Sequence, residues 1–302
     1  MKKYICGVLL SMTFLTSLMA GAKEPVMFER VIQLPHAELR FSMAEDFSRD
    51  MPAAPLVEKL TVDMLSGLKT PGDRFVIGRR WWDLKPPGWF KKPLGSMQMT
   101  ISIGGGIDVG QLNFCKMTQS EFLIFYRESL VNKWKPHNEG IASADLLKFG
   151  VNVYPFFSGR GQEYIPYFEF KKNNKGIIWL SSGAGQDANM YYYFSAPVGA
   201  ANFVEVEFIG APDLNGSPYL FQNLVMERAR LINESVLVAF GKENCLALGG
   251  GNWIEANSVE LLKPDPSLLP KPIPVEEFLR KNGLKELPGT RELLEGSKNN
   301  LF

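Results

Sequence analysis

Apolar and polar residues alternate along several stretches of the chain, most regularly over residues 97–103. There, Met97, Met99, Ile101 and Ile103 are separated by Gln98, Thr100 and Ser102. Because successive side chains of a strand point to opposite faces of a sheet, this alternation predicts a half-buried β-strand. Comparable runs, rich in β-branched and aromatic residues, predict further strands over residues 39–43, 74–84, 151–157, 163–171, 177–180, 191–196 and 203–209.

A helical period predicts two helices. The first begins at Thr118, where Thr118 and Glu121 form a capping-box pattern that satisfies free N–H groups at the helix start. The second begins at Pro218, whose missing N–H is harmless in the first turn of a helix. The apolar faces are Phe122, Phe125, Tyr126, Leu130 and Trp134 in the first helix, and Leu220, Phe221, Leu224, Val225 and Leu231 in the second. Residues 57–68 fit either a short helix or a strand.

The order of these elements is strands, helix, strands, helix, which predicts an α+β domain with helices covering an antiparallel sheet. We place this domain at residues 23–262 and expect its second half to be a meander. Five prolines between residues 263 and 275 predict a stiff extended linker. Residues 263–302 are therefore expected to form a Pro-rich C-terminal extension that ends in a short helical tail.

This arrangement resembles the PsbP-like fold, which also includes small periplasmic lipoproteins. The resemblance is carried by residues 40–43 leading to Asp46 and Phe47, by residues 97–103, 190–194 and 203–208, and by the helices from Thr118 and Pro218. The insertion at residues 65–96 and the tail after residue 245 depart from the pattern. The resemblance implies a PsbP-like sandwich between residues 38 and 240.

The first 22 residues have the three parts of a secretory signal peptide. Lys2 and Lys3 form a basic start, residues 4–18 are uncharged and mostly apolar, and residues 20–22 read Ala-Gly-Ala. A membrane anchor is the alternative, but a spanning helix needs about 20 apolar residues. The only early cysteine, Cys6, lies within the segment to be removed, which argues against a lipoprotein. We expect cleavage after Ala22, export to the periplasm and no stable membrane anchor.

Charge and cysteine content agree with an exported globular protein. Loss of Lys2 and Lys3 changes the formal net charge from +1 to −1. A nearly neutral exported chain gives no electrostatic reason to bind nucleic acid. Cys115 and Cys245 then remain, and in an oxidising compartment they are expected either to form one disulfide or to stay as two separate buried thiols.

Signatures of catalysis are scarce in this sequence. His36 and His137 are its only histidines, and it contains no zinc-binding motif and no nucleophile elbow, so we expect no metal and no cofactor. Residues 104–106 are all glycine, but no Lys-Ser/Thr pair follows them, so a turn or bulge is favoured over a phosphate loop. Glu205 and Glu207 occupy one face of a predicted strand, which we interpret as a solvated sheet face.

One segment stands out as a candidate binding surface. Residues 79–92 contain three tryptophans, one phenylalanine and five cations. Trp and Arg are enriched in protein interfaces because each buries a large area and keeps a polar group. We therefore select Arg80, Trp82, Trp89 and Phe90 as partner-binding anchors. Two alternatives remain: the aromatic residues attach the insertion to the body of the domain, or they contact a membrane surface.

These observations favour a non-catalytic periplasmic protein that binds another protein. In signal peptide, size and α+β meander, the chain resembles the immunity proteins of Gram-negative type VI secretion systems, which neutralise a secreted toxin by occluding it. The resemblance implies a toxin as a possible partner. Two other functions remain open: a periplasmic hydrolase that attacks cell wall or lipid with carboxylates, and an envelope assembly factor.

Overall fold

The computed structural model describes ten main stretches of the chain. They are residues 25–35, 37–48, 55–85, 92–105, 113–114, 116–144, 152–153, 167–184, 190–213 and 218–240, together with residues 261, 273–274, 277 and 280. The predicted signal peptide, the two predicted anchors Trp89 and Phe90, and the two cysteines Cys115 and Cys245 lie outside the described residues. The predicted disulfide therefore stays a prediction.

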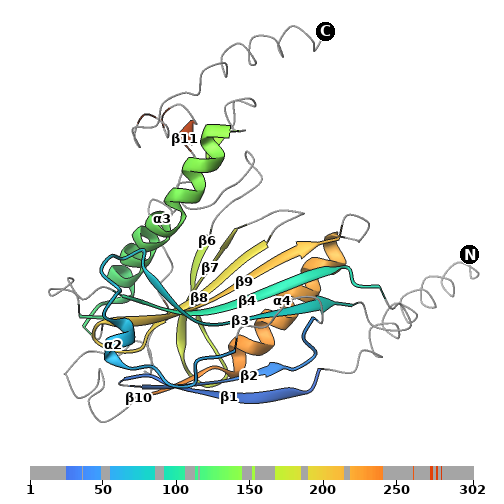
Figure 1. Cartoon of the computed structure of the whole chain (residues 1–302), viewed down its shortest axis with the longest axis horizontal. Helices are drawn as coiled ribbons and strands as arrows, with labels where there is room; N and C mark the ends of the chain where they lie inside the picture. Colours follow the sequence, from blue (N-terminus) through green and yellow to red (C-terminus); the bar gives the residue numbers. More distant parts are fainter. Residues whose placement is uncertain are drawn as a thin grey trace, which may run out of the picture.

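A six-stranded antiparallel sheet forms the centre of the fold (Figure 1). In spatial order its strands are β3 (Arg74–Leu84), β4 (Gly95–Gly105), β9 (Asn202–Pro212), β8 (Met190–Pro197), β7 (Ile178–Ala184) and β6 (Tyr167–Lys172). Strands β6 to β9 follow one another in space as in sequence, so the predicted meander is confirmed for these four strands. The strand predicted at residues 151–157 is not part of it, because its described residues, Asn152 and Val153, pair in a separate two-stranded sheet. The hairpin β3–β4 joins this meander through β4 and β9, which are about a hundred residues apart in sequence.

A smaller sheet lies beside the first, with strand order β1 (Met27–Gln33), β2 (Ala37–Ala44) and β10 (Leu237–Phe240). Of these strands, the sequence pattern predicts only β2, because β1 and β10 are short and are fixed by pairing with β2. In the C-terminal part, β11 (Ile273–Pro274) pairs with β5 (Asn152–Val153). The predicted Pro-rich extension thus contains at least one point that pairs with the preceding domain.

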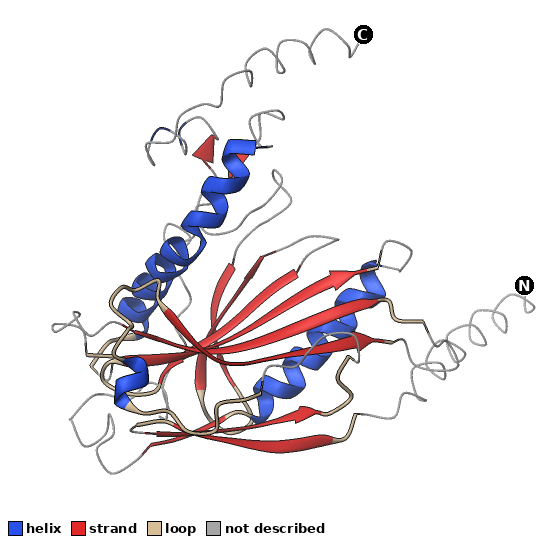
Figure 2. Ribbon diagram, viewed as in Figure 1, coloured by secondary structure: helices blue, strands red, loops and turns tan. Residues whose placement is uncertain are grey.

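Helices cover both faces of the six-stranded sheet (Figure 2). Helix α3 (Gln119–Ala144) contacts the face that carries Phe203 and Glu205 of β9. Helix α4 (Pro218–Ser235) packs on the opposite face, where a Cβ added to Gly210 would meet Val225. We call these the α3 face and the α4 face. Helix α4 also contacts β2 and therefore lies between the two sheets (Figure 1).

The apolar face predicted for α3 is the face that packs, whereas the face predicted for α4 is only partly right, because Leu220, Leu224 and Leu231 are half-buried. In α4, the buried residues are Phe221, Val225, Ala229 and Ile232, at helical spacing. In α3, Phe122 and Tyr126 join an aromatic cluster around Phe203 with ring centroids 5.9–6.1 Å apart. The short helix α2 (Val62–Leu65) resolves the ambiguity of residues 57–68. The fold is therefore α+β, as predicted.

The capping box of α3 is present as predicted. The Thr118 N–H donates to Glu121 Oε2 at 2.7 Å, and the Glu121 N–H donates to Thr118 Oγ1 at 3.2 Å. We expect Thr118→Ala to lower the free energy of unfolding by about 1 kcal/mol in urea titrations. Thr61→Ala is the matched control, because Thr61 caps the single turn of α2 through a longer, 3.4 Å bond. Equal losses for both variants would contradict the special role of the α3 cap.

Candidate functional site

The predicted partner-binding anchors do not form one exposed patch in the described part of the chain. Trp82 is 0% exposed, and its Nε1–H donates to the Ala44 carbonyl at 3.1 Å. Trp82 is therefore a core residue that joins β3 to β2, and its selection as a surface anchor is wrong. Arg80 is half-buried, with its guanidinium 5.4 Å from the Phe47 ring. Burial and the nearby Arg30 charge lower the pKa of Arg80.

The error at Trp82 has a clear physical cause. In β3, Trp82 pairs with Met97 and therefore points to the α4 face, which is covered at this point. The Arg228 guanidinium of α4 lies 5.8 Å from its ring, and the Phe47 ring lies 5.8 Å away. The alternative that aromatic residues of this segment attach it to the body of the domain is thus correct for Trp82.

The two carboxylates on the α3 face are buried, so the interpretation of a solvated face is wrong. Glu205 is 0% exposed and receives three charged or polar contacts. Arg74 Nη2 lies 3.1 Å from Glu205 Oε2, Lys133 Nζ lies 2.8 Å from Oε1, and the Tyr126 hydroxyl donates to Oε2 at 2.8 Å. Lys133 also bridges to Glu207 Oε1 at 3.2 Å. We call these five residues the buried charge cluster.

The electrostatics of the buried charge cluster argue against a catalytic acid. Burial alone would raise the pKa of Glu205, but the charges of Arg74 and Lys133 outweigh it and hold this pKa at about 2. Burial, followed by the Glu205 charge, raises the pKa of the Tyr126 hydroxyl well above its usual value. A general acid in a hydrolase needs a carboxyl whose pKa is raised towards neutrality. Glu205 is instead a permanent anion that ties α3 to the sheet.

The described part of the chain contains no candidate metal site. No group of three or more His, Cys, Asp or Glu side chains within that portion is placed to hold an ion. The carboxylates of Glu205 and Glu207 are already neutralised by protein cations, so they are poor ligands.

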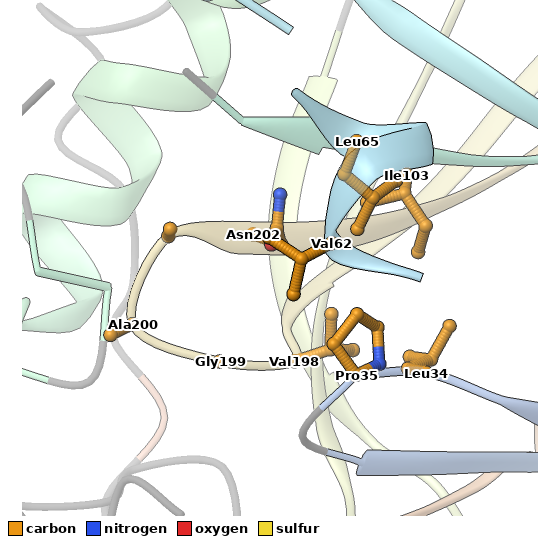
Figure 3. A pocket seen from close by; sticks show the side chains of 10 residues that line it. Leu34, Pro35, Val62, Leu65, Ile103, Val198, Gly199, Ala200 and Asn202 are labelled. Carbon is orange, nitrogen blue, oxygen red and sulfur yellow. The ribbon is translucent and has the colours of Figure 1, made fainter. Parts of the chain in front are cut away.

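An apolar pocket of about 180 Å³ opens at one end of the six-stranded sheet (Figure 3). Four chain segments build it: the β1–β2 turn, helix α2, strand β4 and the turn from β8 to β9. The lining residues are Leu34, Pro35, Val62, Leu65, Ile103, Val198, Gly199, Ala200, Ala201 and Asn202. Asn202 supplies the one polar side chain of this lining. We call this the apical pocket.

The size and rim of the apical pocket suit one bulky apolar group. An apolar cavity of about 150 Å³ holds one benzene ring, so the apical pocket is large enough for a phenyl ring or a branched alkyl chain. Its rim on α2 is itself apolar and exposed, since Val62, which lines the pocket, is 60% exposed. Gly199 is buried, yet a Cβ added there meets no atom within 4 Å. A side chain can therefore begin at Gly199, in the pocket lining, without displacing a neighbouring atom.

A larger groove, of about 790 Å³, runs between α4 and strands β6, β7 and β8. Charged residues along it pair with one another: Lys171 with Glu169 at 3.0 Å, and Arg230 with Glu227 at 2.8 Å. Leu261, from the segment after β10, also lines this groove and packs against the core. Because the chain itself already enters the groove, we take the apical pocket as the candidate functional site.

Comparison with protein-family models, curated proteins and solved structures gives no match. Within the described stretches, no helix is both long and apolar enough to cross a membrane. The reading of function therefore rests on the geometry of the chain alone.

The residues of the apical pocket have no signature in the sequence. Leu34 and Val198 are separated by more than 160 residues, and each belongs to a short connection between strands. A pocket of this kind arises only when the two sheets come together, so alternation and motif spacing cannot predict it. The one available signal is the apolar pair Val62 and Met64 on an exposed turn.

Proposed function

We propose that this chain is an exported, non-catalytic protein that binds another protein through the apical pocket. The observation that carries the proposal is a cavity sized for one side chain, with an exposed apolar rim and no reactive group among its lining residues. Interfaces commonly depend on one apolar anchor that fills such a pocket and excludes water. Arg80, Trp89 and Phe90 remain predicted contributors to the same function.

The biological form of this function that we favour is toxin neutralisation, as in the periplasmic immunity proteins that the sequence resembles. The order of strands, helix, meander and helix also supports the proposed PsbP-like sandwich. Neither proposal requires a reactive group, in agreement with the neutralised carboxylates of the buried charge cluster. A hydrolase that uses carboxylates is less well supported, because Glu205 is held ionised and lies under α3.

The apical pocket can be filled from within by Gly199→Phe. The new ring would occupy the space that a partner side chain needs, whose burial contributes about 1.5–3 kcal/mol. We expect the partner to bind Gly199→Phe at least about tenfold more weakly than wild type. The partner would be captured from periplasmic extract on the immobilised wild-type protein, identified by mass spectrometry, and its affinity then measured by calorimetry.

Gly67→Phe is the matched control for this experiment. A Cβ at Gly67 also meets no atom within 4 Å, but Gly67 does not line the apical pocket. Wild-type affinity is expected for Gly67→Phe, with unchanged circular dichroism for both variants. Equal affinity of the two variants would overturn the role of the pocket. A partner that is cleaved or chemically modified during incubation would overturn the non-catalytic proposal.

A further inference from the structure

Strand β1 forms one edge of the three-stranded sheet, and no other described segment pairs with most of this edge. Among the described residues, β1 is hydrogen-bonded as a strand only to β2. Its last residue, Gln33, makes two additional backbone hydrogen bonds: its N–H donates to the Glu58 carbonyl at 2.7 Å, and its carbonyl accepts from the Leu60 N–H at 2.8 Å. Because both bonds go to residues 58–60 and not to β2, the backbone N–H and C=O of Gln33 point away from β2.

In an antiparallel ladder, the backbone groups of every second residue point to the same side of the strand, so the outward direction found at Gln33 repeats along β1. If the backbone groups of Gln33 point outward, those of Val31, Glu29 and Met27 do so as well. Ser42 provides an independent check, because it lies opposite Glu29 in the β1–β2 register. The Ser42 N–H donates to Ser235 Oγ at 2.8 Å and is therefore not bonded to Glu29. Three residues of β1 thus present outward N–H and C=O groups at the edge.

This edge has only part of the usual protection against pairing with another chain, namely the charges of Glu29 and Arg30. Exposed edge strands are normally interrupted by Pro or Lys or bent by a bulge. The sequence of β1, MFERVIQ, contains neither residue type, and the β1–β2 register runs without a shift. Val26 is 63%, Phe28 42% and Val31 37% exposed. They are three of the eight large apolar residues found exposed in the described chain, so apolar surface is concentrated along this edge.

The charges of β1 argue against a second copy of the same chain as its occupant. In a two-fold antiparallel pairing that uses all three outward residues, Glu29 lies opposite the Glu29 of the second copy. One neighbouring register places Arg30 opposite Arg30, and the other places Pro25, which has no N–H, opposite the outward Val31. Like charges directly opposite one another destabilise a strand pair. An occupant with a cation opposite Glu29 and apolar residues opposite Met27 and Val31 avoids both conflicts.

We propose that β1 pairs antiparallel with an extended segment of the partner protein that has the pattern apolar–x–Lys/Arg–x–apolar. This inference rests on the proposed function and specifies the partner segment. The position of the edge supports it, because β1 leads directly into Leu34 and Pro35 of the apical pocket. Residues 58–60 cover the edge at Gln33 and continue into α2, whose Val62 lines the same pocket. Strand pairing and pocket filling would thus form one continuous contact.

The test is selection of peptides from a random dodecapeptide display library on the full-length protein, secreted under its own N-terminal segment and purified. Wild type is expected to enrich peptides with a basic residue between two apolar ones. With Glu29→Lys, the enriched peptides should carry Asp or Glu at their central position. The peptides selected on wild type should bind this variant about tenfold more weakly. Val31→Pro, which removes one outward N–H, should also weaken them about tenfold.

Glu169→Lys is the matched control, since it makes the same charge change at an exposed position of edge strand β6. It should leave the enriched pattern unchanged, and all variants should keep the wild-type circular dichroism spectrum. No enrichment, or a pattern that Glu29→Lys and Val31→Pro leave unchanged, would overturn the inference. A dimer in light scattering that Val31→Pro dissociates would also overturn it, in favour of a second copy. If Gly199→Phe abolishes partner binding while the β1 variants do not, the proposed function holds and only this inference fails.

Discussion

Arg74→Met is expected to lower the free energy of unfolding by about 3–5 kcal/mol, as is usual when one partner of a buried ion pair is removed. The Arg74 guanidinium is almost completely buried and lies between Glu205 Oε2, at 3.1 Å, and Ser129 Oγ, at 2.6 Å. Without it, Glu205 would keep only one cation partner among the described residues, Lys133, which it shares with Glu207. Urea titrations followed by tryptophan fluorescence would measure the loss.

Arg79→Met is the matched control, because Arg79 is exposed on the same strand. Substitutions at such surface sites usually change stability by less than about 0.5 kcal/mol. The double variant Arg74→Met/Glu205→Leu replaces both charges by apolar groups and is expected to recover part of the loss, since a buried ion pair is often no more stable than a well-packed apolar pair. If Arg74→Met and Arg79→Met destabilise equally, the buried charge cluster does not link α3 to the sheet.

Patterns that act over a few residues predict much of this fold. The sequence indicates β3 at its observed bounds, and the capping box of α3 forms the two bonds that it predicts. Strand alternation and helix capping are local, because they depend on side-chain direction and on backbone groups within one turn. Strands β1 and β10 are not predicted as strands, because their formation depends on β2, which is distant in sequence from β10.

The buried charge cluster shows why long-range contacts escape this kind of reasoning. Glu205 alternates with apolar residues, which fits a solvated sheet face as well as a buried one. The cations that make its burial possible, Arg74 and Lys133, lie 131 and 72 residues away in sequence. Nothing local indicates that they will meet. The same applies to Trp82, whose burial depends on Arg228 of α4.

The candidate site also depends on contacts between segments that are distant in sequence. The sequence does not indicate that the apolar residues of α2 and β1 are exposed, and it gives no role for them. The apical pocket requires the β1–β2 turn and the β8–β9 turn to meet, and the open edge of β1 is defined by the bonds between Gln33 and residues 58–60. Function in this protein is therefore attributed to surfaces that form between elements rather than to a motif within one element.

Acidification should remove about 3 kcal/mol of stability through Glu205 alone, by the linkage between a shifted pKa and folding. The pKa of Glu205 is about 2 in the folded state, against an ordinary value of 4.5. Because the folded state holds its proton less tightly than the unfolded state, the contribution is complete above pH 4.5. It is lost as the pH falls from about 4.5 to 2. Urea titrations at intervals between pH 6 and pH 2 would trace this loss.

The Arg74→Met/Glu205→Leu double variant isolates this contribution, because it has no carboxyl group at residue 205 and no unpaired Arg74 charge. Its free energy of unfolding should fall by about 3 kcal/mol less than that of wild type over the same pH interval. Glu169→Gln removes an exposed carboxyl group from β6 and should keep the wild-type slope. A double variant that loses stability as steeply as wild type would show that Glu205 is not the residue whose protonation unfolds the protein. The acid sensitivity would then have to come from other carboxylates.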